Sequence, residues 1–101
     1  MPATTSVQRS DYARPTISEQ FHAFDAAHPW IYTSLERLVA QRLAAGATRV
    51  GMKALFEVLR WRRPRGITGL NNNYTALYAR RLIDEHPEWA PAIEIRRRRS
   101  P

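Results

Sequence analysis

The stretch PWIYTSLERLVAQRLAAG, from Pro29 to Gly46, predicts a single amphipathic helix. Proline favours a helix start, because it has no N–H to leave without a partner and its fixed φ suits the first turn. Glycine favours the end, because it readily adopts the left-handed conformation that closes many helices. The apolar side chains in between recur at helical spacing, and we expect them to form a buried stripe of Trp30, Ile31, Leu35, Leu38 and Val39.

Two further helices are predicted on either side of this one. The sequence Thr16-Ile17-Ser18-Glu19 fits a capping box, so a helix should begin at Thr16 and end near His28, before Pro29. Its apolar face carries Ile17, Phe21 and Phe24. After a turn over residues 47–51, another helix presents apolar residues at positions i, i+3, i+4 and i+7 and ends before Pro64. Those apolar residues are Met52, Leu55, Phe56 and Leu59.

A fourth helix is predicted to begin at the triplet Asn71-Asn72-Asn73, one of which should be its N-cap, and to end at Pro87. The side chains expected on its inner face are Tyr74, Leu77, Tyr78 and Leu82. Further on, apolar and polar residues alternate over residues 93–96, which indicates a short strand. Residues 66–70 are the candidate partner of residues 92–96 in a small sheet.

The predicted fold class is mainly α: a compact four-helix single domain over residues 16–95, with a short C-terminal strand or hairpin. Residues 1–15 are polar and predict a flexible arm, and residues 96–101 form a basic tail. Three helices, the last of which is the reading helix, followed by a basic strand would make a helix-turn-helix or winged-helix arrangement. The basic connection over residues 63–70 is longer than the usual tight turn of such a motif.

Composition narrows the function classes. The chain has no cysteine, so neither a disulfide framework nor a thiolate metal site is available. No apolar run approaches the roughly 20 residues of a membrane span, and no signal peptide is visible. We therefore expect a cytoplasmic protein without a membrane partner.

Catalytic and metal-binding motifs are not found. His22, Asp25 and His28 are spread over too wide an arc of their helix to close on one ion. There is no glycine-rich phosphate loop, no nucleophile elbow and no HExxH motif. We predict a protein that is not an enzyme and needs no cofactor or metal.

The excess of positive charge lies in the second half of the chain. Residues 1–48 carry four basic and four acidic side chains, whereas residues 49–101 carry twelve basic and five acidic ones, which gives the formal net charge of +7. All but one of the basic residues, Lys53, are arginines. Arginine presents a planar fork of donors that suits phosphates and base edges. This distribution is typical of a scaffold with one polyanion-binding face.

The fourth helix is the candidate for reading bases. At about 100° per residue, one face of it groups Asn72, Asn73, Ala76, Ala79 and Arg80. Asparagine can bond adenine and arginine can bond guanine, each with two hydrogen bonds, and alanines permit close approach to a groove. The alternative is that the asparagines only cap the helix and that Arg80 is a solvated charge.

Two arginine clusters flank this helix and are candidates for phosphate contacts. The candidate nucleic-acid-binding residues are Arg60, Arg62, Arg63, Arg65, Asn72, Asn73, Arg80, Arg96, Arg97, Arg98 and Arg99. Arg81 falls on the inner face instead, where we expect it either to extend its guanidinium to solvent or to pair with a carboxylate, for which Glu57 and Glu85 are the candidates. Trp61 and Trp89 could stack on bases, but the favoured interpretation places both at the edge of the core.

Several segments resemble a group of short phage and prophage proteins of unassigned role. They are Phe21–Phe24, His28–Tyr32, Ala54–Trp61, Leu70–Tyr74, Tyr78–Arg80, Pro87–Trp89 and Glu94 with the arginines after it. The asparagine triplet followed by Tyr-Ala-Arg is the most distinctive part, and the loop Arg62–Gly69 is shorter and richer in arginine than in that group. The resemblance implies a mobile-element origin. Phage genomes encode small repressors, excision factors and proteins that block host defence nucleases.

The first functional hypothesis is a non-enzymatic module that binds duplex DNA and acts as a transcriptional regulator. The second is a protein-interaction module or inhibitor that docks on a host protein, since arginine and tryptophan are common in binding hot spots. RNA is a third candidate partner, because an arginine-rich tail does not separate it from DNA. Whether the chain forms a homodimer stays open.

Overall fold

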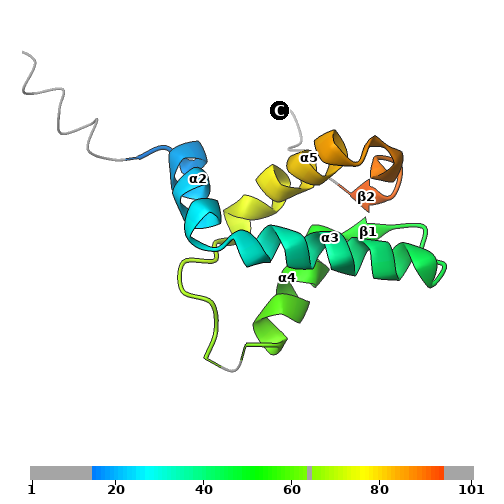
Figure 1. The fold of residues 1–101 in the computed structure, drawn as a ribbon, viewed down its shortest axis with the longest axis horizontal. Helices are drawn as coiled ribbons and strands as arrows, with labels where there is room; N and C mark the ends of the chain where they lie inside the picture. Colours follow the sequence, from blue (N-terminus) through cyan, green and yellow to red (C-terminus); the bar gives the residue numbers. More distant parts are fainter. Residues whose placement is uncertain (1–14, 64, 95–101) are drawn as a thin grey trace, which may run out of the picture.

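The computed structural model describes residues 15–63 and 65–94. Across these ranges the protein is mainly helical, as predicted. It has the helices α2 (Ile17–Ala27), α3 (Pro29–Ala44), α4 (Met52–Trp61) and α5 (Thr75–Glu85), with single-turn 3-10 helices η1 (Asn72–Tyr74) and η2 (Pro87–Trp89) and strands β1 (Val50–Gly51) and β2 (Ile93–Glu94). In Figure 1, α3 extends across the molecule, α5 lies above it and α4 below it, and α2 stands beside the first turns of α3 and α5.

The local signals in the sequence set the helix ends as expected. The Thr16 N–H donates to Glu19 Oε1 (2.9 Å) and the Glu19 N–H donates to Thr16 Oγ1 (3.1 Å), which forms the predicted capping box. At the C-terminal end of α3, Gly46 has a φ of +100°. The Gly46 N–H donates to the Leu43 carbonyl (3.0 Å) and the Ala47 N–H to the Arg42 carbonyl (2.9 Å), a Schellman-type closure.

The core is a single apolar cluster to which all four helices contribute. The predicted buried faces are confirmed for most positions, with exceptions at Ile17, which is 41% exposed, and at Trp30 and Leu77, which are half-buried. The centre of the cluster is aromatic: Tyr78 is fully buried and packs edge-to-face with Phe21 and Phe56 at ring-centroid distances of 4.7 and 6.1 Å. These contacts join α2, α4 and α5.

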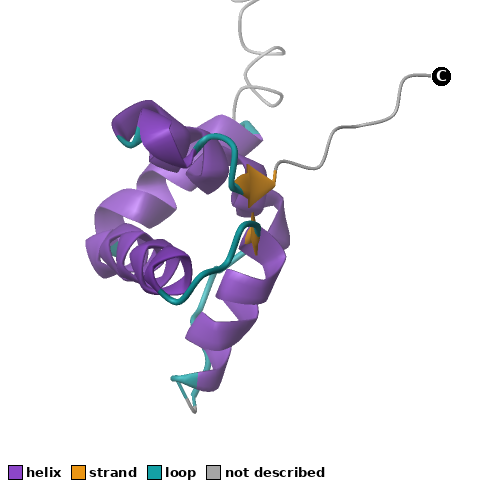
Figure 2. Cartoon of the chain, turned by 90° about the vertical axis from the view of Figure 1, so that its right-hand side faces the viewer, coloured by secondary structure: helices purple, strands orange, loops and turns teal. Residues whose placement is uncertain are grey.

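The short strand near the C-terminus is present, but its predicted partner is wrong. β2 pairs in parallel with β1, with Val50 opposite Ile93 and Gly51 opposite Glu94. The Val50 N–H donates to the Ala92 carbonyl at 2.8 Å. Residues 66–70 do not form a strand because Gly66 and Gly69 have φ values of +77° and +85°, which interrupt an extended backbone. These two strands, orange in Figure 2, form the one sheet in the described part of the chain.

A wing made of residues 66–70 and 92–96 is therefore absent from the described residues, and the helix-turn-helix and winged-helix details stay predictions. The predicted arm, residues 1–15, lies outside the described residues except for Pro15, and so does the predicted tail, residues 96–101. Among the helices that the structure describes, none is long and apolar enough to cross a membrane.

Candidate nucleic-acid interface

Trp61, at the end of α4, is exposed over 85% of its surface. The expectation that it would lie at the edge of the core is wrong. The buried side of α4 carries Met52, Leu55, Phe56 and Leu59. Trp61 follows Met52 by nine residues, which places it about 180° around the helix from that buried side. The helical periodicity of the sequence therefore already indicated that Trp61 is exposed.

Arg60 lies at the junction between α4 and η1. One of its guanidinium nitrogens donates to Asn72 Oδ1 at 2.7 Å and approaches the Leu70 carbonyl at 3.5 Å, while the other donates to Glu57 Oε2 at 3.2 Å. The structure thus brings Arg60 and Asn72 together. Since these donors are already engaged, Arg60 serves to position the asparagine segment against the end of α4.

The three arginines that follow are exposed and belong to none of the ion pairs in the described part of the chain: Arg62, Arg63 and Arg65. The Arg63 guanidinium carbon lies 4.0 Å from the centre of the Trp30 ring, within the range of a cation–π contact. This contact orients Arg63 without using its hydrogen-bond donors. We call Arg60, Trp61, Arg62, Arg63 and Arg65 the arginine–tryptophan patch.

The asparagine triplet begins η1 rather than α5 itself. Asn71 Oδ1 accepts from the Asn73 N–H at 2.8 Å, so Asn71 is the N-cap of η1, whereas the N-cap of α5 is Tyr74 and not one of the asparagines. Asn72 and Asn73 are exposed beside the patch, and Arg80 is exposed farther along α5.

The predicted outer face of α5 is partly wrong. Ala79 is 1% exposed and belongs to the core with Tyr78 and Leu82, and Ala76 is half-buried. Neighbouring elements cover a wider arc of α5 than the inner stripe predicted from the sequence. The surface left for contact with a groove therefore consists of Asn72, Asn73 and Arg80 without the alanines. Arg96, Arg97, Arg98 and Arg99 lie outside the described residues.

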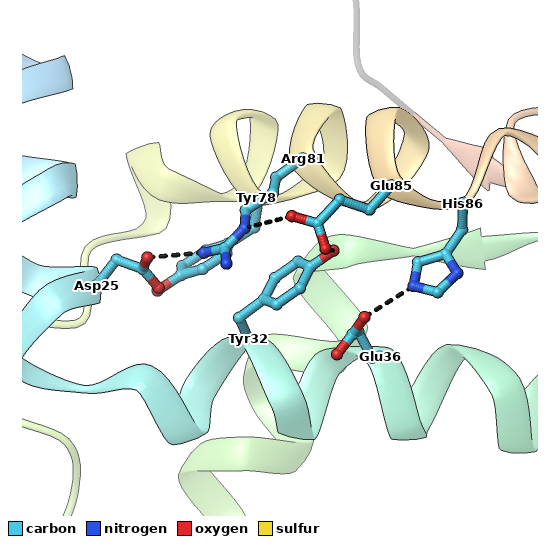
Figure 3. Close-up of polar contacts among 7 residues, drawn as sticks. All are labelled: Asp25, Tyr32, Glu36, Tyr78, Arg81, Glu85 and His86. Carbon is cyan, nitrogen blue, oxygen red and sulfur yellow. Dashed lines mark hydrogen bonds and ion pairs between the residues drawn. The ribbon is translucent and has the colours of Figure 1, made fainter.

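A second polar cluster lies between α2, α3 and α5 (Figure 3). Arg81 donates to Asp25 Oδ2 (2.7 Å) and Glu85 Oε2 (3.1 Å), and its guanidinium carbon is 3.8 Å from the centre of the Tyr32 ring. The pairing of Arg81 with Glu85 confirms one expected partner. The other, Glu57, is wrong because that carboxylate bonds Arg60 instead. The contact with Asp25 was not predicted, because the two residues are 56 positions apart.

This cluster is structural. The hydroxyl of Tyr78 donates to Asp25 Oδ1 (3.2 Å) and that of Tyr32 to Glu85 Oε1 (3.0 Å). Burial, together with the adjacent carboxylate, raises the pKa of both tyrosines well above the ordinary value, so both stay neutral donors. Burial alone would lower the pKa of Arg81, but the hydrogen bonds and charges of Glu85 and Asp25 outweigh it and raise that pKa. The tyrosine hydroxyls, the carboxylates of Asp25 and Glu85 and the Arg81 guanidinium bond to one another.

Trp89 meets the expectation for a core edge: it is half-buried and stacks on His86, with ring centroids 4.0 Å apart. His86 Nε2 lies 2.7 Å from Glu36 Oε2, and this bond raises the pKa of the imidazole above its usual value. His28 Nδ1 lies 3.0 Å from the Phe24 carbonyl. Within residues 15–63 and 65–94, no three histidine or carboxylate side chains are grouped closely enough to hold a metal ion.

Comparison with known proteins gives no relative: no family model, no curated protein and no solved structure matches this chain. The resemblance to phage and prophage proteins stays an expectation from the sequence. The candidate interface consequently rests on the geometry of the arginine–tryptophan patch and the asparagine segment next to it.

Proposed function

We propose that this protein is a non-enzymatic module that binds duplex DNA and serves as a regulator of phage or prophage origin. One observation carries the proposal: the hydrogen bond between Arg60 and Asn72 brings an exposed arginine cluster and an exposed pair of asparagines to one place. The first group suits phosphates and the second suits base edges.

The distribution of ion pairs supports this location. Away from the patch, Arg49 pairs with Glu94 at 2.8 Å and Arg81 with Asp25 and Glu85. The other exposed basic side chains outside these pairs, Arg37, Arg42, Lys53 and Arg80, are spread over three helices, whereas Arg62, Arg63 and Arg65 lie within four residues. Among the ion pairs of the described residues, the patch takes part in one, between Arg60 and Glu57. Arg62, Arg63 and Arg65 therefore leave a net positive charge at this end of α4. Such a charge attracts phosphates and releases their counterions on binding.

The test measures binding of the full chain to a 20-base-pair duplex by fluorescence anisotropy over a range of salt concentrations. The triple variant Arg62→Ala, Arg63→Ala, Arg65→Ala should lower the log–log salt slope by about 0.9 for each phosphate that is no longer neutralised, so by nearly 3 in total. The matched control, Arg37→Ala, Arg42→Ala, Lys53→Ala, removes the same charge from exposed positions elsewhere. An equal decrease in both variants would contradict the assignment of the patch.

Sequence preference has a separate test. Replacing Asn73 and Arg80 with alanine should relax discrimination between duplexes selected from a random pool, at roughly 1–3 kcal/mol for each base that the variant no longer recognises. If the double variant keeps the sequence preference of the unsubstituted protein, Asn73 and Arg80 do not read bases, and only the phosphate contacts of the proposal stand.

The exposed Trp61 also suits the alternative function, docking on an acidic host protein, because tryptophan and arginine dominate many binding hot spots. The two functions separate in one experiment. A stoichiometric protein partner, together with no binding to any duplex at low salt, would support docking and overturn the proposal of DNA binding.

A further inference from the structure

Trp61 calls for a physical explanation that phosphate binding does not supply. Of the large apolar side chains in the described residues, it is the most exposed, at 85% against 41% for Ile17. A buried tryptophan removes roughly 150–250 Å² from water, so leaving it in solvent forgoes a large apolar contribution to stability. Such exposure is understandable if a flat partner covers the indole in the bound state.

The surroundings of the indole restrict what that partner can be. Trp61 lines an open, shallow depression together with Glu57, Arg60 and Arg63. Both arginines are held in place, Arg60 by Glu57 and Asn72 and Arg63 by the face of Trp30. A flat aromatic surface that shares this depression with the Arg63 guanidinium, whose hydrogen-bond donors the contact with Trp30 does not use, matches a nucleobase together with a neighbouring phosphate.

The partner base must be unpaired. Inside a duplex both faces of each base are covered by neighbouring bases, and a groove offers only base edges. A single strand exposes base faces, and aromatic side chains stack on them with little regard for sequence. Glu57 also lines this depression, and its negative charge disfavours a phosphate beside it, so the phosphate contacts fall to Arg62, Arg63 and Arg65.

On the basis of the proposed function, we infer that Trp61 is a stacking site for an unpaired base and that the protein prefers DNA in which a single strand adjoins a duplex. The duplex then contacts the arginines and asparagines described above, and the first bases of the single strand cover the indole. This preference is specific to the site and is not a consequence of net charge.

The experiment compares three labelled probes at one salt concentration: a blunt 20-base-pair duplex, the same duplex with a ten-nucleotide overhang, and the unpaired strand alone. Trp61→Ala should weaken binding to the overhang probe by about 5- to 150-fold, the range expected for one base stacked on an aromatic ring. Binding to the blunt duplex should fall by a much smaller factor, because a duplex contacts the arginines and asparagines of the interface and offers no base face to the indole. Trp61→Phe should retain most of the affinity, and Ile17→Ala is the control for removal of an exposed apolar side chain.

A second measurement reports on the indole itself. The overhang probe should quench tryptophan fluorescence in the unsubstituted protein and do so much less in Trp61→Phe. Since the side chain is exposed, neither variant should alter the unfolding midpoint, which is checked by circular dichroism.

The outcomes separate this inference from the proposed function. Equal affinities of the unsubstituted protein and Trp61→Ala for the overhang probe, or an equal decrease on all three probes, would overturn the stacking site while duplex binding stands. If none of the probes binds at low salt, the proposed function is wrong and the stacking site falls with it.

Discussion

We expect the hydrogen bonds of Asp25 to be the main polar contacts that stabilise the packing of α2 against α5. Its two carboxylate oxygens accept from the Tyr78 hydroxyl at 3.2 Å and from the Arg81 guanidinium at 2.7 Å. Tyr78 is completely buried, and the Asp25 side chain is 22% exposed. Replacing Asp25 with alanine therefore leaves a buried hydroxyl without an acceptor and removes one of the carboxylates that neutralise Arg81.

The magnitude follows from these two effects. A buried donor without a partner costs about 1–3 kcal/mol. The Arg81 contribution counts only at about 0.5–1 kcal/mol, because its side chain is 37% exposed and it keeps its bond to Glu85. We expect Asp25→Ala to lower the free energy of unfolding by about 1.5–4 kcal/mol, or the melting temperature by roughly 6–32 °C.

Tyr78→Phe removes the donor as well as the need for an acceptor, so it should cost only about 0.5–1.5 kcal/mol. Asp84→Ala is the control, since Asp84 is exposed and its side chain takes part in no side-chain hydrogen bond or ion pair among the described residues. Urea unfolding followed by circular dichroism measures all three variants. If Asp25→Ala is no more destabilising than Asp84→Ala or Tyr78→Phe, the bonds between α2 and α5 do not contribute as argued.

Two further predictions concern the ends of α3 and α5. Because the bond to Glu36 raises the pKa of His86 above about 6.5, its ion pair stabilises the fold fully below that pH and is lost as pH rises through the higher folded-state value. Glu36→Gln should consequently cost up to about 1 kcal/mol at pH 6 and much less at pH 9, and a cost independent of pH in chemical unfolding would contradict this. Gly46→Ala should destabilise the protein by about 1–2 kcal/mol, because an alanine at a φ of +100° is strained although no atom lies within 4 Å of the added carbon. An unchanged melting temperature would show that the backbone there relaxes without cost.

The sequence alone determined where the helices begin and end. Thr16 with Glu19, Pro29 and Gly46 act through bonds and backbone preferences within a few residues, so their effects can be predicted without knowledge of the rest of the chain. The apolar spacing in α4 likewise selected the buried side of that helix. The same spacing also indicates that Trp61 lies on the exposed side of α4. This was missed because aromatic residues at helix ends are usually buried.

Only the tertiary structure decided which distant residues meet. The pairing of Val50 with Ile93, the bond from Arg81 to Asp25 and that from Arg60 to Asn72 join segments whose local sequences carry no information about each other. The burial of Ala79 has the same origin, since the width of the covered arc on a helix depends on how closely its neighbours approach. Short-range backbone energetics therefore fixed the elements, and the packing of the shared core placed the arginine–tryptophan patch beside the asparagines.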